Sequence, residues 1–293
     1  MVVSAELYPF KNNYTKIDDK HRLHYVDEGN GPAMLMVHGN PTWSFYYRNL
    51  IKEFSRDFRV IAPDHMGCGL SDKPSLDEYN YTLESRVQNL TKLVQELKLK
   101  DITLVVHDWG GMIGVTFATR FPDLIKQLVV FNTAAFHNPK GLDLPLSIRL
   151  CRNPLVGEYL VRGFNAFSHG ANLRCCTRKK LSAAEKKGYL APYNNWKNRL
   201  AVHRFVKDIP LTKEDEAWSV VNQSEKNLSR LSNKPMLILW GEKDFVFDDS
   251  FLRRWREYFP QAEVKTFPES GHYIVEDSHD EIVTAMHDFV AIS

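Results

Sequence analysis

The chain has 293 residues, of which 43% are hydrophobic and 25% are charged, and its formal net charge is +2. This composition is typical of a globular protein that buries a large core without disulfide staples. The small net charge gives no reason to expect nucleic-acid binding, and the lack of a signal-peptide pattern or an apolar run of roughly 20 residues predicts a cytoplasmic protein without a transmembrane segment.

Short apolar runs alternate with amphipathic segments along the chain. In chain order, the runs predict strands at residues 22–26, 33–37, 58–62, 102–106, 128–131, 236–240 and 264–267. Apolar residues at helical spacing predict helices at residues 83–99, 112–121, 251–259 and 279–289. Because strands that are apolar throughout are typical of a parallel sheet covered on both faces, we predict a doubly wound α/β fold.

The strand–helix alternation is interrupted once, between the predicted strands at 128–131 and 236–240. Residues 134–211 show a helical pattern broken by prolines and glycines, with no convincing strand. We interpret them as a helical cap domain inserted after the sixth strand, and residues 1–133 and 212–293 as the core domain. Residues 141–200 carry eleven Lys or Arg and three Asp or Glu. This basic stretch is either a solvated surface or a contact face for anionic lipid or an acidic partner, including an oligomer or enzyme complex.

Three polar residues follow predicted strands at the carboxyl end, where open parallel sheets bind ligands. Asp108, Asp244 and His272 occur in the order nucleophile, acid, histidine that characterises the α/β-hydrolase triad. Asp108 stands at a strand-to-helix turn, and Gly110 and Gly111 allow the chain to turn sharply there. An Asp at this position can also simply cap the helix. The acid and histidine farther along the chain favour a covalent nucleophile.

An Asp nucleophile in place of Ser changes which bonds the enzyme can break. A carboxylate that displaces a leaving group from a saturated carbon forms an ester, and activated water can then hydrolyse that ester at its carbonyl carbon. A serine would form an ether, which water does not readily cleave. Asp108 therefore predicts a substrate with an electrophilic saturated carbon, such as a haloalkane, an epoxide or a strained lactone.

His272 and Asp244 are the predicted partners of the nucleophile. His272 would act as the general base toward water, and Asp244 would orient its imidazole through the other ring nitrogen. Asp248 and Asp249 lie close enough in sequence to compete for the role of Asp244. An acid after the sixth strand is the other known arrangement, but residues 131–135 contain no carboxylate, which favours Asp244.

Asn40 and Trp109 are the candidate anion-binding residues. In this arrangement the oxyanion hole is formed by the loop after the third strand of the fold, here the strand predicted at 33–37, and by the residue after the nucleophile. The backbone N–H groups of Asn40 and Trp109 should therefore face the ester carbonyl oxygen. Their side chains are uncharged donors that suit a departing halide. The alternatives are turn formation before Pro41 for Asn40 and packing for Trp109. His38 and His107 are interpreted as structural, because one base suffices.

These motifs resemble those of the haloalkane dehalogenase family over nearly the whole chain. The resemblance is carried by the loop His38-Gly39-Asn40-Pro41-Thr42, the turn His107-Asp108-Trp109-Gly110 and the strand end Val60-Ile61-Ala62-Pro63-Asp64. It implies an α/β-hydrolase fold with a mostly parallel eight-stranded sheet and a cap after strand 6. It also implies a triad of Asp108, His272 and Asp244, a halide site at Asn40 and Trp109 as in the third subfamily, and hydrolysis of small apolar haloalkanes to alcohol and halide ion.

The chain also resembles the β-lactone decarboxylase of long-chain olefin biosynthesis. This second resemblance is carried by Asn132-Thr133-Ala134-Ala135-Phe136, Phe164-Asn165-Ala166-Phe167 and Pro192-Tyr193-Asn194-Asn195-Trp196. It implies an alkene and carbon dioxide as products. Epoxide hydrolysis is a third reading, with Tyr159, Tyr189 and Tyr193 as candidate acids. None of the three reactions requires a metal or an organic cofactor, and the four cysteines show no metal-ligand spacing.

Overall fold

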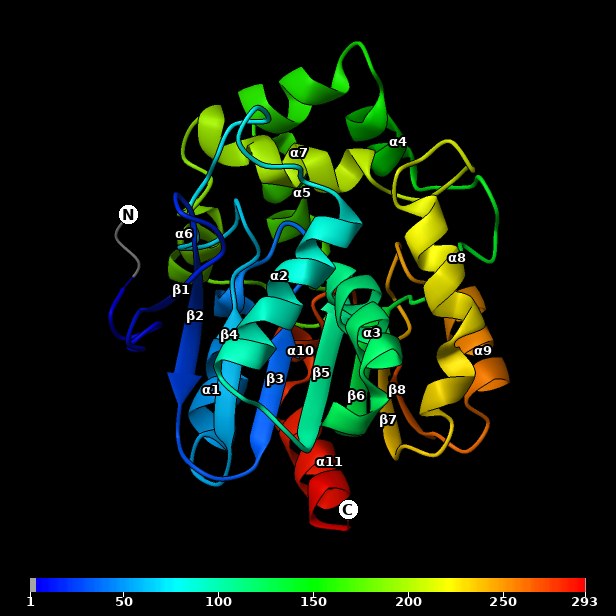
Figure 1. Cartoon of the computed structure of the whole chain (residues 1–293). Helices are drawn as coiled ribbons and strands as arrows, with labels where there is room; N and C mark the ends of the chain where they lie inside the picture. The colour runs from blue at the N-terminus through cyan, green and yellow to red at the C-terminus, as the bar shows by residue number, and fades with distance from the viewer. Residues whose placement is uncertain (1–3, 293) are drawn as a thin grey trace.

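The computed structural model describes residues 4–292, and an eight-stranded sheet forms its centre (Figure 1). The strand order is β1-β2-β4-β3-β5-β6-β7-β8. β1 and β2 pair antiparallel, as do β2 and β4, and every later pair is parallel. The strands are β1 Asn13–Lys16, β2 Arg22–Glu28, β3 Ala33–Val37, β4 Arg59–Pro63, β5 Ile102–Asp108, β6 Ile125–Thr133, β7 Met236–Gly241 and β8 Glu263–Phe267. The predicted α/β-hydrolase fold is confirmed.

Helices cover both faces of the sheet (Figure 1). One core layer contains apolar side chains of α2, α3, α8 and α9, and the layer on the other face contains those of α1, α10 and α11. The helices of the core are α1 Arg48–Phe54, α2 Leu83–Glu96, α3 Trp109–Arg120, α8 Trp218–Lys226, α9 Asp249–Tyr258, α10 Ile274–Asp277 and α11 His279–Ile292.

Strand β5 illustrates why the central strands are apolar throughout. Successive side chains of a strand point to opposite faces, so Leu104 and Val106 pack in the layer with α2 and α3, whereas Val105 packs in the layer with α1. All seven residues of β5 are buried. Because the parallel strands run in the same direction, their carboxyl ends lie along one edge of the sheet, and the loops that leave this edge carry the candidate site.

The cap consists of helices that follow β6 and lie beyond the carboxyl edge of the sheet (Figure 1). Buried polar contacts attach it to the core. The Trp43 indole donates to the carbonyl oxygen of Gly188 at 3.2 Å, and the Tyr193 hydroxyl donates to that of Thr42 at 3.2 Å. The cap elements are α4 Leu146–Arg152, the π-helical turn Tyr159–Gly163, α5 Ala166–Arg174, α6 Ala183–Leu190 and α7 Leu200–Lys207. The exact domain limits at residues 134 and 211 stay a prediction.

The helices are short for a chain of this size. The longest, α2 and α11, have 14 residues each, whereas a bilayer-spanning helix needs roughly 20. Across residues 4–292, no helix has the length and apolar character that crossing a membrane requires. The four cysteines, Cys68, Cys151, Cys175 and Cys176, are free thiols.

Candidate active site

Asp108 occupies a sharp turn between β5 and α3. Its backbone has φ 51° and ψ −127°, a conformation that side chains rarely adopt outside a nucleophile turn. The turn depends on close approach of glycines, since a Cβ on Gly110 would collide with the carbonyl oxygen of Val37 and one on Gly39 would collide with the Asp108 carboxylate. The Thr133 hydroxyl donates to the Asp108 carbonyl oxygen. These contacts present the Asp108 carboxylate at the carboxyl edge of the sheet.

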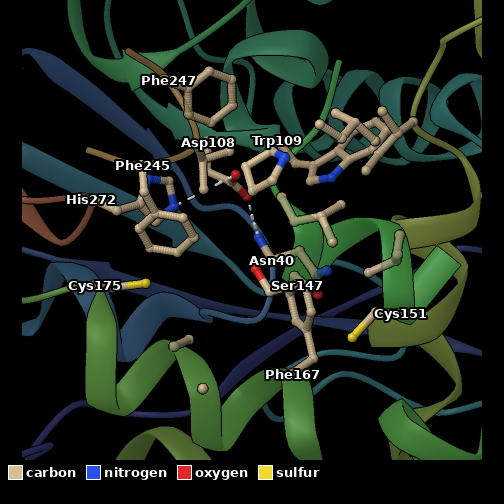
Figure 2. A pocket seen from close by; sticks show the side chains of 18 of the residues that line it. Asn40, Asp108, Trp109, Ser147, Cys151, Phe167, Cys175, Phe245, Phe247 and His272 are labelled. Carbon is tan, nitrogen blue, oxygen red and sulfur yellow. Dashed lines mark hydrogen bonds and ion pairs between the residues drawn. The ribbon is translucent and has the colours of Figure 1, made fainter. Parts of the chain in front are cut away.

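The structure brings the three predicted triad residues together (Figure 2). His272 Nδ1 lies 2.8 Å from Asp244 Oδ2, and His272 Nε2 lies 3.7 Å from Asp108 Oδ2. All three side chains are buried. The imidazole thus stands between the two carboxylates, bonded to one and close to the other. This geometry allows His272 to hold a proton on Nδ1 and to act through Nε2 on Asp108 or on a water beside it.

Burial and neighbouring charges shift the pKa values of Asp108 and His272 in opposite directions. Burial raises the pKa of Asp108, and the opposing effects of His272 and of the backbone N–H groups of Asn40 and Trp109 offset this only in part. Burial alone would lower the pKa of His272, but the Asp244 and Asp108 carboxylates raise it more, so the net pKa lies above its ordinary value. The site therefore favours a cationic His272 beside the carboxylates, as long as Asp108 is ionised.

Asp244 is held in place by the backbone of its own loop and by a neighbouring strand. Its Oδ1 accepts from the N–H groups of Val246 and Phe247 at 2.7 and 3.2 Å. The Asn132 side chain, at the end of β6, bonds both the N–H and the carbonyl oxygen of Gly241 at 2.8 and 2.9 Å. It thereby fixes the end of β7, from which the Asp244 loop departs. The sequence marks the stretch around Asn132 by its lack of a carboxylate and by the resemblance to β-lactone decarboxylase, and neither signal predicts this contact.

The two competing acids have other partners. Asp248 caps α9 by accepting from the N–H of Ser250 at 3.0 Å, and it also forms an ion pair with Lys140 at 2.8 Å. Asp249 lies 3.4 Å from Arg253 on the surface of α9. Neither carboxylate contacts His272 in the described residues, so the geometry leaves Asp244 as the acid beside the imidazole.

Asn40 contributes its backbone rather than its side chain to Asp108. The Asn40 N–H donates to Asp108 Oδ1 at 2.6 Å, and the Trp109 N–H also donates to this carboxylate. The Asn40 side chain instead points its Nδ2 to the carbonyl oxygen of Val202 in α7, at 3.2 Å. Its Oδ1 is buried without a hydrogen-bond partner among residues 4–292. The two backbone donors are therefore placed to stabilise negative charge at Asp108, as expected of an oxyanion hole.

A cavity of about 180 Å³ lies above Asp108, between the core and the cap. In Figure 2, Phe245 and Phe247 lie on the same side of Asp108 as His272, and Phe167 and Cys151 of the cap lie on the opposite side. Most of the lining is apolar, and its polar residues are Asn40, Asp108 and His272 together with Asn138, Lys140, Asp143, Ser147 and Arg174. Such a cavity suits a small apolar substrate with one polar reacting group.

Several aromatic residues singled out from the sequence lie away from this cavity. Phe164 and Trp196 are exposed on the outside of the cap. The Tyr189 hydroxyl donates to Glu276, and that of Tyr193 donates to the Thr42 carbonyl oxygen. Tyr159 is exposed as well. Within the described part of the chain, none of these side chains lines the cavity. The three tyrosines considered as acids for epoxide hydrolysis are therefore not among the residues that line the cavity above Asp108.

The histidines interpreted as structural are buried and bonded to backbone. His107 Nε2 lies 2.8 Å from the carbonyl oxygen of His272, and His38 Nδ1 lies 2.7 Å from that of Gly39. Burial lowers the pKa of both imidazoles, which keeps them neutral. In residues 4–292, no three His, Cys, Asp or Glu side chains converge to hold a metal ion.

A family model described as alpha/beta hydrolase fold matches residues 32–278. The chain belongs to this family. This α/β-hydrolase is 48% identical over 285 residues to a cis-3-alkyl-4-alkyloxetan-2-one decarboxylase of Shewanella oneidensis, with 97% of this chain and 89% of the relative covered. It is 44% identical to the enzyme of the same name from Xanthomonas campestris pv. campestris, with 92% of each chain covered.

More distant relatives of this α/β-hydrolase are haloalkane dehalogenases. Haloalkane dehalogenase 2 of Mycobacterium bovis is 31% identical over 282 residues, which cover 96% of this chain and 95% of the relative. The solved structure of the haloalkane dehalogenase DbeA from Bradyrhizobium elkani superposes with a TM-score of 0.86 at 23% identity and covers 97% of this chain and all of that chain, which supports the fold. The α/β-hydrolase is thus an enzyme of the haloalkane dehalogenase-like group.

Proposed function

We propose that this α/β-hydrolase converts cis-3-alkyl-4-alkyloxetan-2-ones, which are β-lactones, to an alkene and carbon dioxide. The observation that carries the proposal is the difference in identity between the two groups of relatives. The chain is 48% and 44% identical to decarboxylases of this name and 31% identical to a haloalkane dehalogenase, over nearly its whole length in each case. Haloalkane hydrolysis, the first expectation from the sequence, therefore becomes the second candidate.

The Asn40 side chain is compatible with both candidates. Its Nδ2 carries two N–H groups and donates one of them to the Val202 carbonyl oxygen at 3.2 Å. Release of a halide by an Asn–Trp pair would use the other N–H group together with the Trp109 indole. Opening of a lactone ring at Asp108 makes a weaker demand, because the carboxylate that leaves the carbon stays part of the same molecule and needs no separate ion site.

The proposed reaction begins with attack of an Asp108 carboxylate oxygen on the saturated ring carbon that bears the ring oxygen. The new ester bond forms as the carbon–oxygen bond of the ring breaks, and its electron pair leaves a carboxylate on the neighbouring carbon. That carboxylate then departs as carbon dioxide. The electron pair of the broken carbon–carbon bond forms the alkene, and the ester bond breaks to return Asp108 to its carboxylate form.

This sequence balances without water, oxidant or external proton. Inversion at the attacked carbon followed by loss of the two groups in anti orientation keeps the two alkyl chains on the same side, so a cis lactone gives a cis alkene. His272 and Asp244 have a different task here than in hydrolysis. While Asp108 is held as an ester, the Asp244 carboxylate is the group that raises the pKa of the His272 imidazole, and a cationic His272 close to Asp108 would stabilise Asp108 as a leaving carboxylate.

Haloalkane hydrolysis is retained as the second candidate because of one geometric observation. His272 Nε2 lies 3.7 Å from Asp108 Oδ2, which leaves space at the carbonyl carbon of an Asp108 ester for a water that contacts the imidazole. In this reaction His272 must lose its proton before it can act as a base.

The deciding experiment incubates the purified protein with a cis-3-alkyl-4-alkyloxetan-2-one and measures products by gas chromatography. We expect alkene and carbon dioxide in equal amounts, and no conversion by Asp108→Ala. A β-hydroxy acid in place of alkene would reassign the protein as a lactone hydrolase. A parallel assay of bromide release from a primary bromoalkane, with the same variant as control, tests the second candidate.

A further inference from the structure

The outermost part of the cap carries exposed apolar side chains within residues 142–164, and we call the surface that these exposed side chains form the cap crest. Seven of the eleven exposed large hydrophobic residues within the described chain lie in this segment. Leu155 and Phe164 are 81% and 76% exposed. The seven are Leu142, Leu146, Leu150, Leu155, Val156, Tyr159 and Phe164. Figure 1 shows α4 and the green segments beside it at the end of the molecule opposite the C-terminus. So large a set of bulky apolar side chains on one segment marks a contact surface.

Helix α4 connects this surface to the cavity. On one side of the helix, Ser147, Ile148 and Cys151 line the cavity above Asp108. On the other side, Leu146 and Leu150 are exposed to solvent one turn apart. A single layer of helix therefore separates the cavity from the cap crest. An apolar molecule that leaves the cavity past α4 would meet apolar side chains on the outside as well.

The charge of the cap limits what can cover the crest. Residues 141–200 hold eleven Lys or Arg and three Asp or Glu, whereas the rest of the chain holds 27 and 33. Of the three acids, Glu158 pairs with Arg162 and Glu185 pairs with Arg48 of the core. Of the cations, Arg152 pairs with Asp215 and Arg178 pairs with Glu281. The cap keeps a net positive charge on a chain whose remainder is negative. Two copies facing each other through their caps would repel, and an anionic surface would attract the cap.

We propose that the cap crest docks on the surface of an anionic lipid bilayer. Bulky apolar side chains on a cap of net positive charge are the composition of segments that lie in the bilayer interface, where apolar groups enter the acyl region and Lys and Arg meet anionic head groups. A protein interface fits less well, because its buried centre is depleted of Lys and other charged residues. Docking through the crest places the cavity beside the bilayer, so that an apolar substrate or product passes between them with little exposure to water. The docking does not depend on which reaction Asp108 performs.

The test measures co-sedimentation of the purified full-length protein with vesicles at low ionic strength. One set of vesicles contains equal parts of phosphatidylglycerol and phosphatidylcholine, and the other contains phosphatidylcholine alone. We expect binding to the anionic vesicles that weakens as salt is added. The affinity of the double variant Leu155→Ser/Phe164→Ser for the anionic vesicles should be at least about tenfold lower, because the variant lacks two large apolar groups of the bilayer contact.

The matched control is Leu76→Ser, which removes an exposed leucine (53% exposed) outside the cap, and it should bind as the unaltered protein does. Failure of the unaltered protein to bind anionic vesicles would overturn the proposal and leave an acidic protein partner as the occupant of the crest. Equal binding by the double variant and the control would overturn it too. Because the measurement needs no turnover, its failure is distinguishable from failure of the proposed reaction.

Discussion

The side-chain amide of Asn132 bonds both the N–H and the carbonyl oxygen of Gly241, at 2.8 and 2.9 Å. The two residues are 109 positions apart, and their contact joins the end of β6 to the end of β7. Asp244 lies three residues beyond Gly241 and is 2.8 Å from His272. The position of Asp244, the proposed acid of the triad, thus depends on Asn132, whose side-chain hydrogen bonds go to Gly241 and not to the imidazole.

Replacing Asn132 with Ala should therefore weaken both the fold and the triad. The change leaves the buried N–H of Gly241 without its partner, and we expect a loss of about 1–3 kcal/mol in the free energy of unfolding. It should also lower kcat, because the Asp244 loop is no longer tied to β6. Urea unfolding and single-turnover kinetics measure the two effects. An unchanged kcat in a destabilised variant would restrict Asn132 to a structural role.

Gly39→Ala tests how tightly the nucleophile is enclosed. A Cβ at this position would collide with the Asp108 carboxylate, so the side chain must move. We expect kcat to fall by about a hundredfold, since displacements of roughly 1 Å have this effect at a reacting centre. Gly170→Ala in α5 is the contrast in stability, because its Cβ meets no protein atom within 4 Å and should stabilise the helix by about 0.5–1 kcal/mol. Gly170 also lines the cavity, so only its melting temperature is compared. Equal melting temperatures in the two variants would contradict the described packing.

Asp108→Asn should raise thermal stability while abolishing turnover. Burial raises the pKa of Asp108 above its ordinary value of 3.8. A carboxyl whose pKa is higher in the folded state favours folding when protonated, and this contribution is lost as the pH rises through the folded pKa. At neutral pH the ionised Asp108 therefore lowers the stability of the folded state, and the uncharged Asn removes this destabilisation. Melting temperatures across pH should show the gain at neutral pH and its disappearance below the ordinary pKa; a constant difference would contradict the assignment.

Asp244→Asn should lower the pKa of His272, because the Asp244 carboxylate is the main group that raises it. If activity depends on cationic His272, the alkaline limb of the pH profile should then move to lower pH. We also expect kcat to fall by about 10²–10⁴-fold. NMR titration of the imidazole and a pH profile of kcat measure the two shifts. If His272 acts as a cation beside the leaving group, the pKa of the imidazole and the alkaline limb of the kcat profile should fall together. If His272 acts as a general base, the acidic limb of the kcat profile should instead move to lower pH.

Oxygen-18 water distinguishes the two candidate reactions at the nucleophile itself. Hydrolysis of an Asp108 ester places a water oxygen in the Asp108 carboxylate, whereas the proposed decarboxylation uses no water. After several turnovers of a β-lactone, the peptide that contains Asp108 should remain unlabelled by mass spectrometry. Turnover of a bromoalkane, if the enzyme performs it, should label the same peptide and serves as the positive control. Label acquired during alkene formation would rule out the proposed sequence of steps.

Elements with a long apolar pattern could be predicted from the sequence, and short polar ones could not. The strand predicted at 33–37 is β3, Ala33–Val37. By contrast, β1 (Asn13–Lys16) has four mostly polar residues, and it exists because β2 offers a pairing edge. Helix α1, Arg48–Phe54, has seven residues and was also missed. Tertiary packing determines such elements, and a single sequence carries little trace of it.

The candidate site divides in the same way. Chain order and the strand ends led to Asp108, Asp244 and His272 as a set, because the family of arrangements in which they occur has a fixed order along the chain. The side-chain contact from Asn40 to Val202 joins residues 162 positions apart. No local pattern marks such a contact. The direction of the Asn40 amide was therefore available only from the structure.

The cap leaves the core after β6 and returns before β7, two strands that are neighbours in the sheet. A chain that exits and re-enters at adjacent positions can accept a different insert without any change in strand order. The half of the cavity above Asp108 could thus be exchanged between relatives by recombination at two nearby points, while the core kept its chemistry. Relatives with this fold would then differ in substrate range through exchange of the cap, without rearrangement of the sheet.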